Sequence, residues 1–406
     1  MSLDALAERT LRANWRTGVR RGVPYAYTVP ATPRYRHMWH WDSCFHAIAW
    51  CRYDRGRARA ELRTVLRSGD PDGFLPHTVF WDAPAGWRRA PFYATERSWG
   101  SWRTTTIDPP LLPLAWEHVA RASAEEDPGF ATEALPALAA HLDWLQARRS
   151  VRDDGLLTIV LPDESGLDDA PAYDPVFGPH VHYRPGYFRL VRRWQRLGWD
   201  AHRIAATTDR HCVDVLVTTA YALSLHAMAR LSGEARWATR AARVEQALCE
   251  QCLDPATGLF LHLAGRARTP VRVSTWAALA PLALPGVPLD VRRRLVEEHL
   301  LDPRRYRAAV GIPSVSMDEP SFLPGFDRWR TWRGPSWVNT AWWLVPALRD
   351  LGHGAEADRI VTGLTEAALR DGLREYYDPR DGRGLAARGF GWSCLLAGLV
   401  EVPSAA

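Results

Sequence analysis

The chain has 406 residues, of which 47% are hydrophobic and 24% are charged, and this composition excludes a largely disordered protein. All 51 basic residues are arginines, which excludes enzymes that need a Schiff-base lysine, pyridoxal phosphate or a Walker A lysine. The net charge of +5 comes from arginines dispersed among acids, and this pattern predicts a solvated surface rather than a nucleic-acid partner.

The N-terminal residues 1–9 lack the basic and then apolar plan of a signal peptide. The most apolar stretch, residues 277–289, is short and contains three prolines, so we expect no membrane segment and a cytoplasmic protein. No linker or repeat array divides the chain, and we expect a single domain over residues 1–406. The oligomeric state is left open, a homo-oligomer included.

Apolar residues recur at three- and four-residue spacing over most of the chain, which predicts a mainly helical protein. The clearest predicted helices are 111–124, 131–148, 213–231, 236–251, 291–300, 337–351, 355–370 and 392–400. Asp- and Gly-rich turns at 152–157, 254–260 and 378–385 follow helix pairs. The pattern indicates a toroid of α-hairpins, with roughly twelve helices once segments before residue 60 and around residue 189 are included.

The six cysteines lie mostly in apolar helical runs, which is typical of reduced core thiols. Cys249 and Cys252 form a C-x-x-C pair, but no second pair accompanies them. We therefore expect no metal at this pair.

Four segments break the helical pattern and are rich in Trp, His, Tyr and acids. They are residues 25–42, 73–102, 161–187 and 313–337. A single tryptophan is most simply explained by core packing, but clustering in polar loops is typical of a sugar site, where rings stack on pyranose C–H faces and acids bind hydroxyls.

Two acidic segments could cleave an acetal, a reaction that needs one carboxylic acid and one carboxylate. The segment 162–171 has four acids in seven residues, Asp168 among them, and Glu375 is expected at a helix end between an arginine and tyrosines. Taken alone, each segment is better explained as a solvated loop, because acids are common at protein surfaces. The chain has no H-E-x-x-H, G-x-S-x-G or G-x-G-x-x-G motif, so zincins, serine hydrolases and dinucleotide enzymes have no support.

An ordered series of motifs resembles the mannosylglycerate and glucosylglycerate hydrolases of glycoside hydrolase family 63, and trehalases more weakly. The segments are YTVP at 27–30, WHWDSCFHA at 39–47, GFLPHTVFW at 73–81, ESGLD at 164–168, GIPS at 311–314, WRGPSWVN at 332–339, EYYDP at 375–379 and GFGWS at 389–393. They occur in family order over nearly the whole chain, which makes the resemblance specific.

The resemblance implies an (α/α)6 barrel and single-step hydrolysis of an α-glycoside with inversion. By position, Asp168 is the general acid and Glu375 the general base, and no metal or organic cofactor is needed. Acidic neighbours of Asp168 would favour its protonated form, and Arg374 would favour the ionised form of Glu375. Inversion requires the two carboxyl groups to lie about 6.5–9.5 Å apart.

The matched motifs also nominate residues that bind a small carbohydrate substrate. Asp42 would hold hydroxyls and Trp41 would wall the sugar, although Asp42 also suits a helix N-cap. Arg333 would bind hydroxyls or a glycerate carboxylate, with a buried structural ion pair as the alternative. The further candidates are His77, Trp81, Glu164, Gly166, Trp332, Asn339, Tyr376 and Trp392.

Three acids depart from the family pattern. Asp108 stands where the glycerate hydrolases usually have Gln, Asp163 replaces a common Trp, and Asp169 extends the acidic run. Met38 also replaces the Gln of the usual Q-W-N-W-D block, and His40 its Asn. These departures suggest a polyhydroxylated or amino-bearing substrate rather than a glycerate anion.

Three other functions stay open. One is a trehalase-like or oligosaccharide-trimming α-glucosidase, and another is a sugar-binding barrel without catalysis. The third is a sugar isomerase that works through histidines, for which the candidates are His37, His40, His180 and His182.

Overall fold

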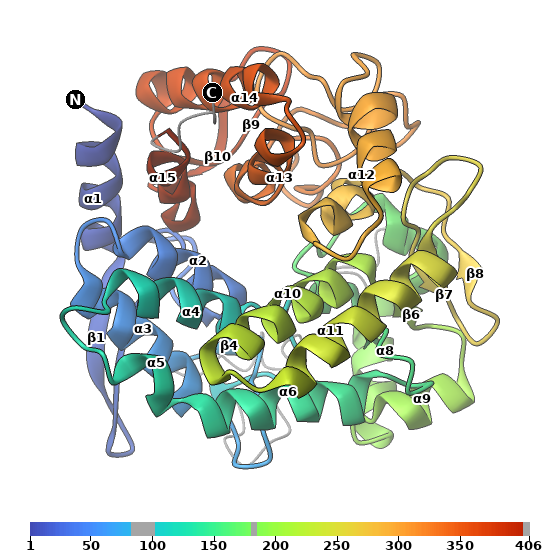
Figure 1. The fold of residues 1–406 in the computed structure, drawn as a ribbon, viewed down its shortest axis with the longest axis horizontal. Coiled ribbons are helices and arrows are strands. Elements are labelled where there is room, and N and C mark those ends of the chain that lie inside the picture. The colour runs from blue at the N-terminus through green and yellow to red at the C-terminus, as the bar shows by residue number, and fades with distance from the viewer. Residues whose placement is uncertain (83–101, 180–184, 401–406) are drawn as a thin grey trace.

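The helices form two concentric rings around a common axis (Figure 1). The computed structural model describes residues 1–82, 102–179 and 185–400. Each inner helical element contacts the next inner element, and the last contacts the first, so the inner ring closes. This closed double ring confirms the predicted (α/α)6 barrel.

Six elements make the inner ring in the part of the chain that the structure describes. They are α2 (His40–Trp50), α4 (Leu112–Ala122), α10 (Val215–Ser232), η5 (Trp276–Ala283), α13 (Val338–Asp350) and the pair η7 (Gly391–Leu395) and α15 (Leu396–Val400). Every residue of α2 is buried. A helix that is buried on all sides has no polar face, and this explains why the amphipathic pattern did not single out α2.

The outer ring packs one helix behind each inner element. Its members are α1 (Leu3–Asn14), α3 (Arg55–Arg67), α6 (Leu135–Arg149), α11 (Ala235–Ala247), α12 (Leu289–Leu295) and α14 (Gly354–Asp371). The outer helices are amphipathic: α3 buries Ala58, Leu62 and Val65 and turns its arginines outward. Asp54 caps α3 through a hydrogen bond from the Arg57 amide.

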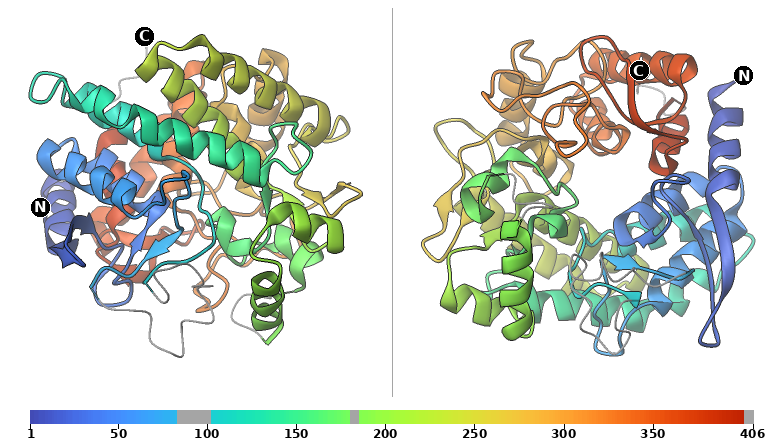
Figure 2. Two further views of the ribbon diagram at one scale, coloured as in Figure 1. Left: turned by 90° about the horizontal axis from the view of Figure 1, so that it is seen from below. Right: turned by 180° about the vertical axis from the view of Figure 1, so that it is seen from behind.

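The connections differ in length at the two ends of the barrel. Inner-to-outer connections such as 51–54, 233–234 and 351–353 are short, whereas outer-to-inner connections such as 150–214 and 301–337 are long. The long connections gather on the face seen in the right-hand view of Figure 2. They carry most of the candidate site residues to the end where the inner elements begin.

The remaining elements are short and lie mainly within the long connections. They are the helices α5 (Phe130–Glu133), α7 (Asp174–Phe177), α8 (Pro185–Arg196) and α9 (Ala201–Thr207), and the 3₁₀ or π segments η2 (Pro162–Ser165), η3 (Pro171–Tyr173), η4 (Leu248–Cys252) and η6 (Val296–Leu300). The strands are β1 (Trp15–Arg20), β2 (Val23–Thr28), β3 (Met38–Trp39), β4 (Thr78–Val79), β5 (Thr158–Ile159), β6 (Cys212–Val213), β7 (Leu263–Ala264), β8 (Thr269–Pro270), β9 (Arg374–Tyr377) and β10 (Gly384–Arg388). All strand pairs are antiparallel, and β5 to β8 form one four-stranded sheet.

The sequence located most of these helices, but among the inner elements it gave no bounds for α2 and missed η5. Each of the eight predicted helices overlaps a helical element of the structure. Each predicted turn has a glycine at positive φ, namely Gly155, Gly258 and Gly382. The stretch that was read only as apolar and proline-rich contains η5, an inner element of the ring.

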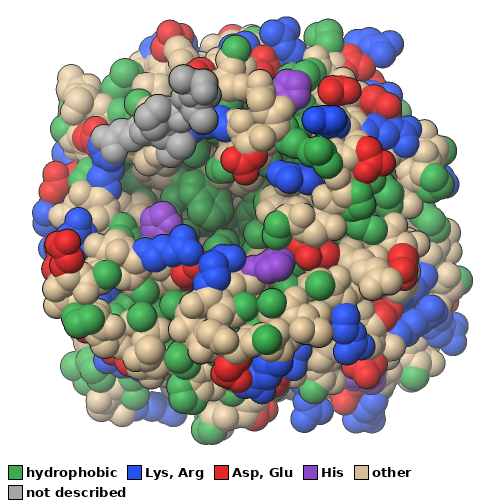
Figure 3. Space-filling model, in the orientation of Figure 1, with side chains coloured by type: hydrophobic (Ala, Val, Ile, Leu, Met, Phe, Trp, Pro, Cys, Tyr) green, Lys and Arg blue, Asp and Glu red, His purple; other side chains and the backbone are tan. Residues whose placement is uncertain are grey.

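Two surface findings complete the description. No helix in the described ranges is both long enough and apolar enough to cross a membrane. The face seen in Figure 3 is hollowed near the middle of the ring, with hydrophobic side chains on the floor of the hollow and Arg and His side chains along its lower rim.

Candidate active site

Glu375 lies on strand β9, which corrects the expectation that it ends a helix, because α14 stops at Asp371. Its side chain is buried and held at both oxygens. The Tyr35 hydroxyl donates a hydrogen bond to Oε1 at 2.7 Å, and the Ala387 amide donates one to Oε2 at 3.1 Å. The carboxylate is therefore fixed in orientation by two separate segments.

The cation beside Glu375 is Arg34, not its sequence neighbour Arg374. Arg34 Nη1 lies 3.6 Å from Glu375 Oε2, whereas Arg374 Nη1 donates to the Ala386 carbonyl. Burial raises the pKa of Glu375 above its ordinary value, and Arg34, Tyr35 and the Ala387 amide oppose this rise. A raised pKa suits a group that must accept a proton during the reaction.

Asp168 follows η2 and is half-buried, on a loop with a sharp turn. Gly166 makes the turn at φ +71°, and its backbone lies against the indole of Trp41, where a Cβ would be 2.5 Å from Cζ2. This contact brings the loop that carries Asp168 to the first turn of α2, which carries Asp42.

Glu164 anchors this loop from inside the protein. It is fully buried, and Arg149 donates to both of its oxygens, at 2.6 and 2.9 Å. The amides of Ile107 and Val160 also donate to it. Its carboxylate is thus occupied by the protein, so the structure gives Glu164 an anchoring place rather than the expected contact with substrate.

Asp42 links the two candidate catalytic carboxyl groups. It lies in the first turn of α2 but is not the N-cap, a position held by Trp39. Burial raises the pKa of Asp42 well above its ordinary value, and the negative charges of Asp168 and Glu375 raise it further. Asp42 is therefore within electrostatic reach of both groups.

Two of the three acids that depart from the family pattern, Asp108 and Asp169, accept hydrogen bonds from backbone amides. Asp108 Oδ2 accepts from the Trp41 amide at 2.9 Å, and Asp169 Oδ1 accepts from the Trp332 amide at 3.1 Å. Asp163 is half-buried within η2. Two of the three unusual acids thus hold the backbones of candidate tryptophans.

Asp108 interacts electrostatically with the other carboxyl groups. Its Oδ1 has no hydrogen-bond partner in the described residues and lies 3.5 Å from His77 Nε2. Burial raises the pKa of Asp108 well above its ordinary value, and Asp42 and Asp168 add to the rise. His77 is thereby placed beside the acid cluster.

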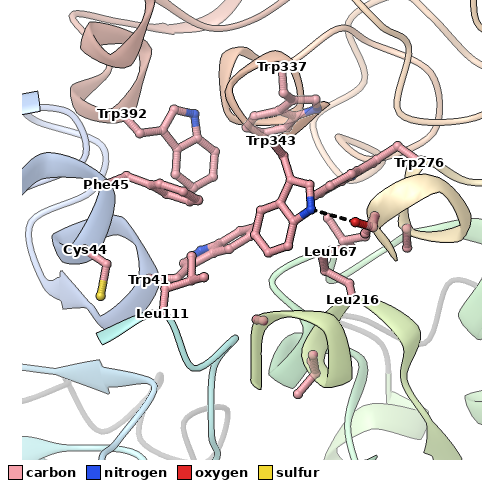
Figure 4. Packing of buried hydrophobic residues seen from close by; sticks show 14 of the residues in the cluster. Trp41, Cys44, Phe45, Leu111, Leu167, Leu216, Trp276, Trp337, Trp343 and Trp392 are labelled. Atoms are coloured by element: carbon pink, nitrogen blue, oxygen red, sulfur yellow. Dashed lines mark hydrogen bonds between the residues drawn. The ribbon is translucent and has the colours of Figure 1, made fainter. Parts of the chain in front are cut away.

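A wall of indole rings is formed by Trp41, Trp332, Trp337 and Trp392, and Figure 4 shows how Trp41, Trp337 and Trp392 lie among the buried hydrophobic residues. Trp332 stacks on Trp337 with ring centroids 3.9 Å apart and planes 7° from parallel. Trp41 lies 6.3 Å from Trp332 and 5.2 Å from Trp392. The structure thus brings together three predicted tryptophans, and it adds Trp337, which lies in the same WRGPSWVN segment but was not singled out.

Three buried donors in this region have no hydrogen-bond partner in the described residues. They are Asn339 Nδ2, Tyr376 Oη and Trp392 Nε1. Buried polar groups are normally hydrogen-bonded, so a ligand or water at this place would satisfy these three donors. All three belong to the predicted site residues.

Arg333 is only partly available. Its Nη2 donates to both oxygens of Asp174 at 2.8 Å, so the structural ion pair expected as the alternative is present. Its buried Nε has no hydrogen-bond partner in the described residues.

Two predictions are not brought into this cluster. Trp81 donates its indole N–H to Met38 Sδ and stacks on Tyr25, so the structure uses it in packing. His40 is buried beside His141, and burial, with the charges of His141 and His77, holds its pKa well below the ordinary value. Of the other histidines considered for an isomerase, His37 packs on Phe80, and His180 and His182 lie outside the described residues.

The sequence missed the two residues that hold Glu375 from the loop before β3, Arg34 and Tyr35. Both lie inside the aromatic segment 25–42 that was singled out, but nothing in the sequence pairs them with a residue 340 positions away. No group of three or more His, Cys, Asp or Glu side chains in the described ranges is arranged to hold a metal ion.

Comparisons with known proteins show the family to which the chain belongs. The family model of the mannosylglycerate hydrolase MGH1-like glycoside hydrolase domain matches residues 35–393. The mannosylglycerate hydrolase of Thermus thermophilus is 32% identical over 92% of this chain and 96% of that protein. The glucosylglycerate hydrolase of Mycolicibacterium hassiacum is 24% identical over 90% of this chain and 92% of that protein.

A solved structure gives the same result. A family 63 mannosylglycerate hydrolase from Thermus thermophilus, in complex with Tris and D-glycerate, superposes with a TM-score of 0.85 at 29% identity, over 98% of this chain and 99% of that chain. The chain is a glycoside hydrolase, and it belongs to the mannosylglycerate hydrolase-like members of glycoside hydrolase family 63.

Proposed function

We propose that this glycosidase hydrolyses a small α-glucoside or α-mannoside in one step with inversion, with Asp168 as general acid and Glu375 as general base. The observation that carries the proposal is the group of rings that joins the two segments. Gly166, two residues before Asp168, packs on Trp41, and Tyr376, the residue after Glu375, packs on Trp337, while Trp392 contacts both Trp41 and Trp337. The two groups therefore border one region, which also contains the indole wall.

The proposed reaction uses each carboxyl group once. Asp168 gives its proton to the glycosidic oxygen as the bond from that oxygen to the anomeric carbon breaks. Glu375 takes a proton from a water molecule, whose oxygen bonds to the same carbon from the opposite face. The products are the free sugar in the β configuration and the aglycone with a hydroxyl group, after which solvent restores both carboxyl groups.

The other site residues would bind the sugar. Asn339, Tyr376 and Trp392 supply donors that the described part of the protein leaves unused, and Asp42, with its raised pKa, can donate or accept. Trp41 and Trp332 would wall the sugar, with His77 and Arg333 at the side of the cluster.

Glycosides of glycerate are the first substrates to test, because the named relatives are mannosylglycerate and glucosylglycerate hydrolases. Trehalose is the comparison substrate for a trehalase-like enzyme. Membership of a hydrolase family favours hydrolysis over the sugar-binding and isomerase functions that the sequence left open. A single catalytic domain in the cytoplasm is part of this proposal and rests on the sequence.

The deciding experiment is proton NMR of a panel of α-glucosides and α-mannosides during turnover. We expect the β-anomer first, and Asp168→Asn and Glu375→Gln to lower kcat by at least about a hundredfold. The matched controls are Asp290→Asn and Glu366→Gln, which make the same changes at exposed helical positions. Prompt release of the α-anomer, or full activity of either site variant, would contradict the assignment.

A further inference from the structure

A groove of about 630 Å³ lies next to Glu375, on the surface formed by the loop before β3, strand β10 and Phe326. Three arginines line it, Arg34, Arg383 and Arg388, and the described residues contribute no acidic side chain to its lining. A concave surface with several guanidinium groups and no carboxylate is suited to an oxyanion, because guanidinium N–H groups match the oxygens of phosphate, sulfate and carboxylates.

The charges of Arg383 and Arg388 are only partly balanced by the described residues. Arg383 lies 3.8 Å from Asp378, a carboxylate that Arg380 also binds. Arg388 is exposed and forms no ion pair with any described residue. Burial lowers the pKa of Arg374, which lies on the neighbouring strand β9, and the charge of Arg388 lowers it further.

Arg34 belongs to the groove and to the candidate active site at once. Its side chain is 37% exposed in the groove, while the Glu375 side chain beside it is 3% exposed. The separation of 3.6 Å between Arg34 Nη1 and Glu375 Oε2 is longer than a good charge-assisted hydrogen bond. An anion in the groove can therefore compete with Glu375 for this guanidinium group.

The groove wall is also part of the support of Glu375. Ala387, which lines the groove, donates its amide to Glu375 Oε2, and Ala386 before it has φ +53°. The register of β10 against β9 shifts between Leu385 and Arg388, so this stretch bulges from the hairpin. The Ala387 peptide and the Arg34 guanidinium group thus belong to the groove wall and also lie against the Glu375 carboxylate.

We propose that this groove binds a small oxyanion through Arg34, Arg383 and Arg388, and that occupancy draws Arg34 away from Glu375, so that Glu375 holds a proton more tightly and is ionised only at higher pH. The binding part stands on the groove alone, and the effect on the base rests on the proposed function. Tyr35, the Ala387 amide, Asp42 and Tyr376 are the other groups that act on or respond to Glu375. With Arg34 withdrawn, Tyr35 and the amide still oppose the effect of burial, but the cation no longer does.

Direct binding is the first test, with sulfate as the probe because its charge is constant over the working pH range. Calorimetric titration at fixed ionic strength, with chloride as the balancing anion, is made on the wild type, Arg388→Gln and Arg293→Gln. Arg293 is exposed on α12 and is not in the groove. We expect saturable binding that Arg388→Gln weakens about fivefold, the ratio expected for one partly exposed ion pair, and that Arg293→Gln leaves unchanged.

The second test is the pH dependence of kcat/KM with and without sulfate. Loss of Arg34 from Glu375 raises the pKa of the base, so sulfate should move the acid limb of the profile to higher pH and leave the plateau above it unchanged. Arg34→Gln should show the moved limb without sulfate and no further response to it.

The two proposals fail separately. Binding to the Glu375→Gln variant needs no hydrolysis, so an enzyme without glycosidase activity still tests the groove. Absent or unsaturable sulfate binding, equal binding by Arg388→Gln, or an effect reproduced by chloride would each overturn the anion site. Saturable binding with an unmoved pH profile would overturn its coupling to Glu375.

Discussion

The backbone of Gly166 is packed against the indole of Trp41, so closely that a Cβ at position 166 would lie 2.5 Å from Trp41 Cζ2. Gly166 precedes Asp168 by two residues, and Trp41 precedes Asp42 by one. The contact therefore helps to set the distance between Asp168, the candidate general acid, and the carboxyl group of Asp42, which interacts electrostatically with both Asp168 and Glu375.

Gly166→Ala should disrupt this contact. The added methyl group must displace a buried ring, and φ +71° adds backbone strain of about 1 kcal/mol. Gly352→Ala is the matched control, because Gly352 also has positive φ but nothing lies within 4 Å of its Cβ position. We expect both variants to lose stability in thermal unfolding, and only Gly166→Ala to lose kcat/KM, by tenfold or more. Equal activity losses in the two variants would show that strain, not the contact with Trp41, is responsible.

Tyr35→Phe should change the pH profile more than the plateau. It removes the 2.7 Å hydrogen bond that lowers the pKa of Glu375 and leaves the burial that raises it. The base is then ionised only at higher pH, so the acid limb of kcat/KM should move upward. A hydrogen bond to a charged group is worth about 1.5 kcal/mol, which corresponds to roughly tenfold on that limb. A uniform loss at every pH would mean that Tyr35 acts on the substrate instead.

Arg149→Met should lower the free energy of unfolding far more than a substitution at the surface. Glu164 would keep its two backbone donors but lose the cation that balances its buried charge. Breaking a buried ion pair from one side costs about 3–5 kcal/mol. Arg12→Met, which breaks an exposed pair with Glu8, should cost less than about 1 kcal/mol. Urea denaturation of both variants measures the difference, and similar midpoints would contradict the anchoring role of Glu164.

Asp108→Asn should change the choice of aglycone. The amide oxygen can still accept from the Trp41 amide, while the cluster with Asp42 and Asp168 loses one acid. The wild type should prefer neutral or amino-bearing α-glycosides to glycerate glycosides, because an anionic aglycone meets this cluster. The variant should narrow that preference several-fold, as measured by the ratio of kcat/KM for glucosylglycerate and a neutral glucoside. Equal use of both substrates by the wild type would remove the basis of the prediction.

The sequence was most informative where helices have one exposed face. The outer helices α11 and α14 were located almost to their ends, because their polar arginines and glutamates alternate with buried residues. The inner element η5 was missed because it is almost wholly buried and contains Pro281, so neither amphipathy nor helix propensity marks it.

The site shows the same division. Motif order brought Trp41, Asp42, Asp168 and Glu375 into one proposal, but the sequence could not show which groups are already occupied. Nothing in the sequence distinguishes Glu164 from its acidic neighbours, and only the structure shows that Arg149 binds it. Arg34 and Glu375 lie on two connections far apart in the sequence, and no local pattern predicts their pairing. The sequence suggested Arg374 as the partner of Glu375 because the two are adjacent, but Arg374 donates to the Ala386 carbonyl instead.

The ring of indoles has a practical consequence for following ligand binding. Trp332 and Trp337 are stacked almost in parallel, with Trp41 and Trp392 close to them. Rings at such separations couple their electronic transitions, so this group should contribute its own signal to near-ultraviolet circular dichroism and emission. A sugar that enters beside Trp41 would perturb that signal, and the enzyme thus carries an optical reporter of occupancy that needs no label and no turnover.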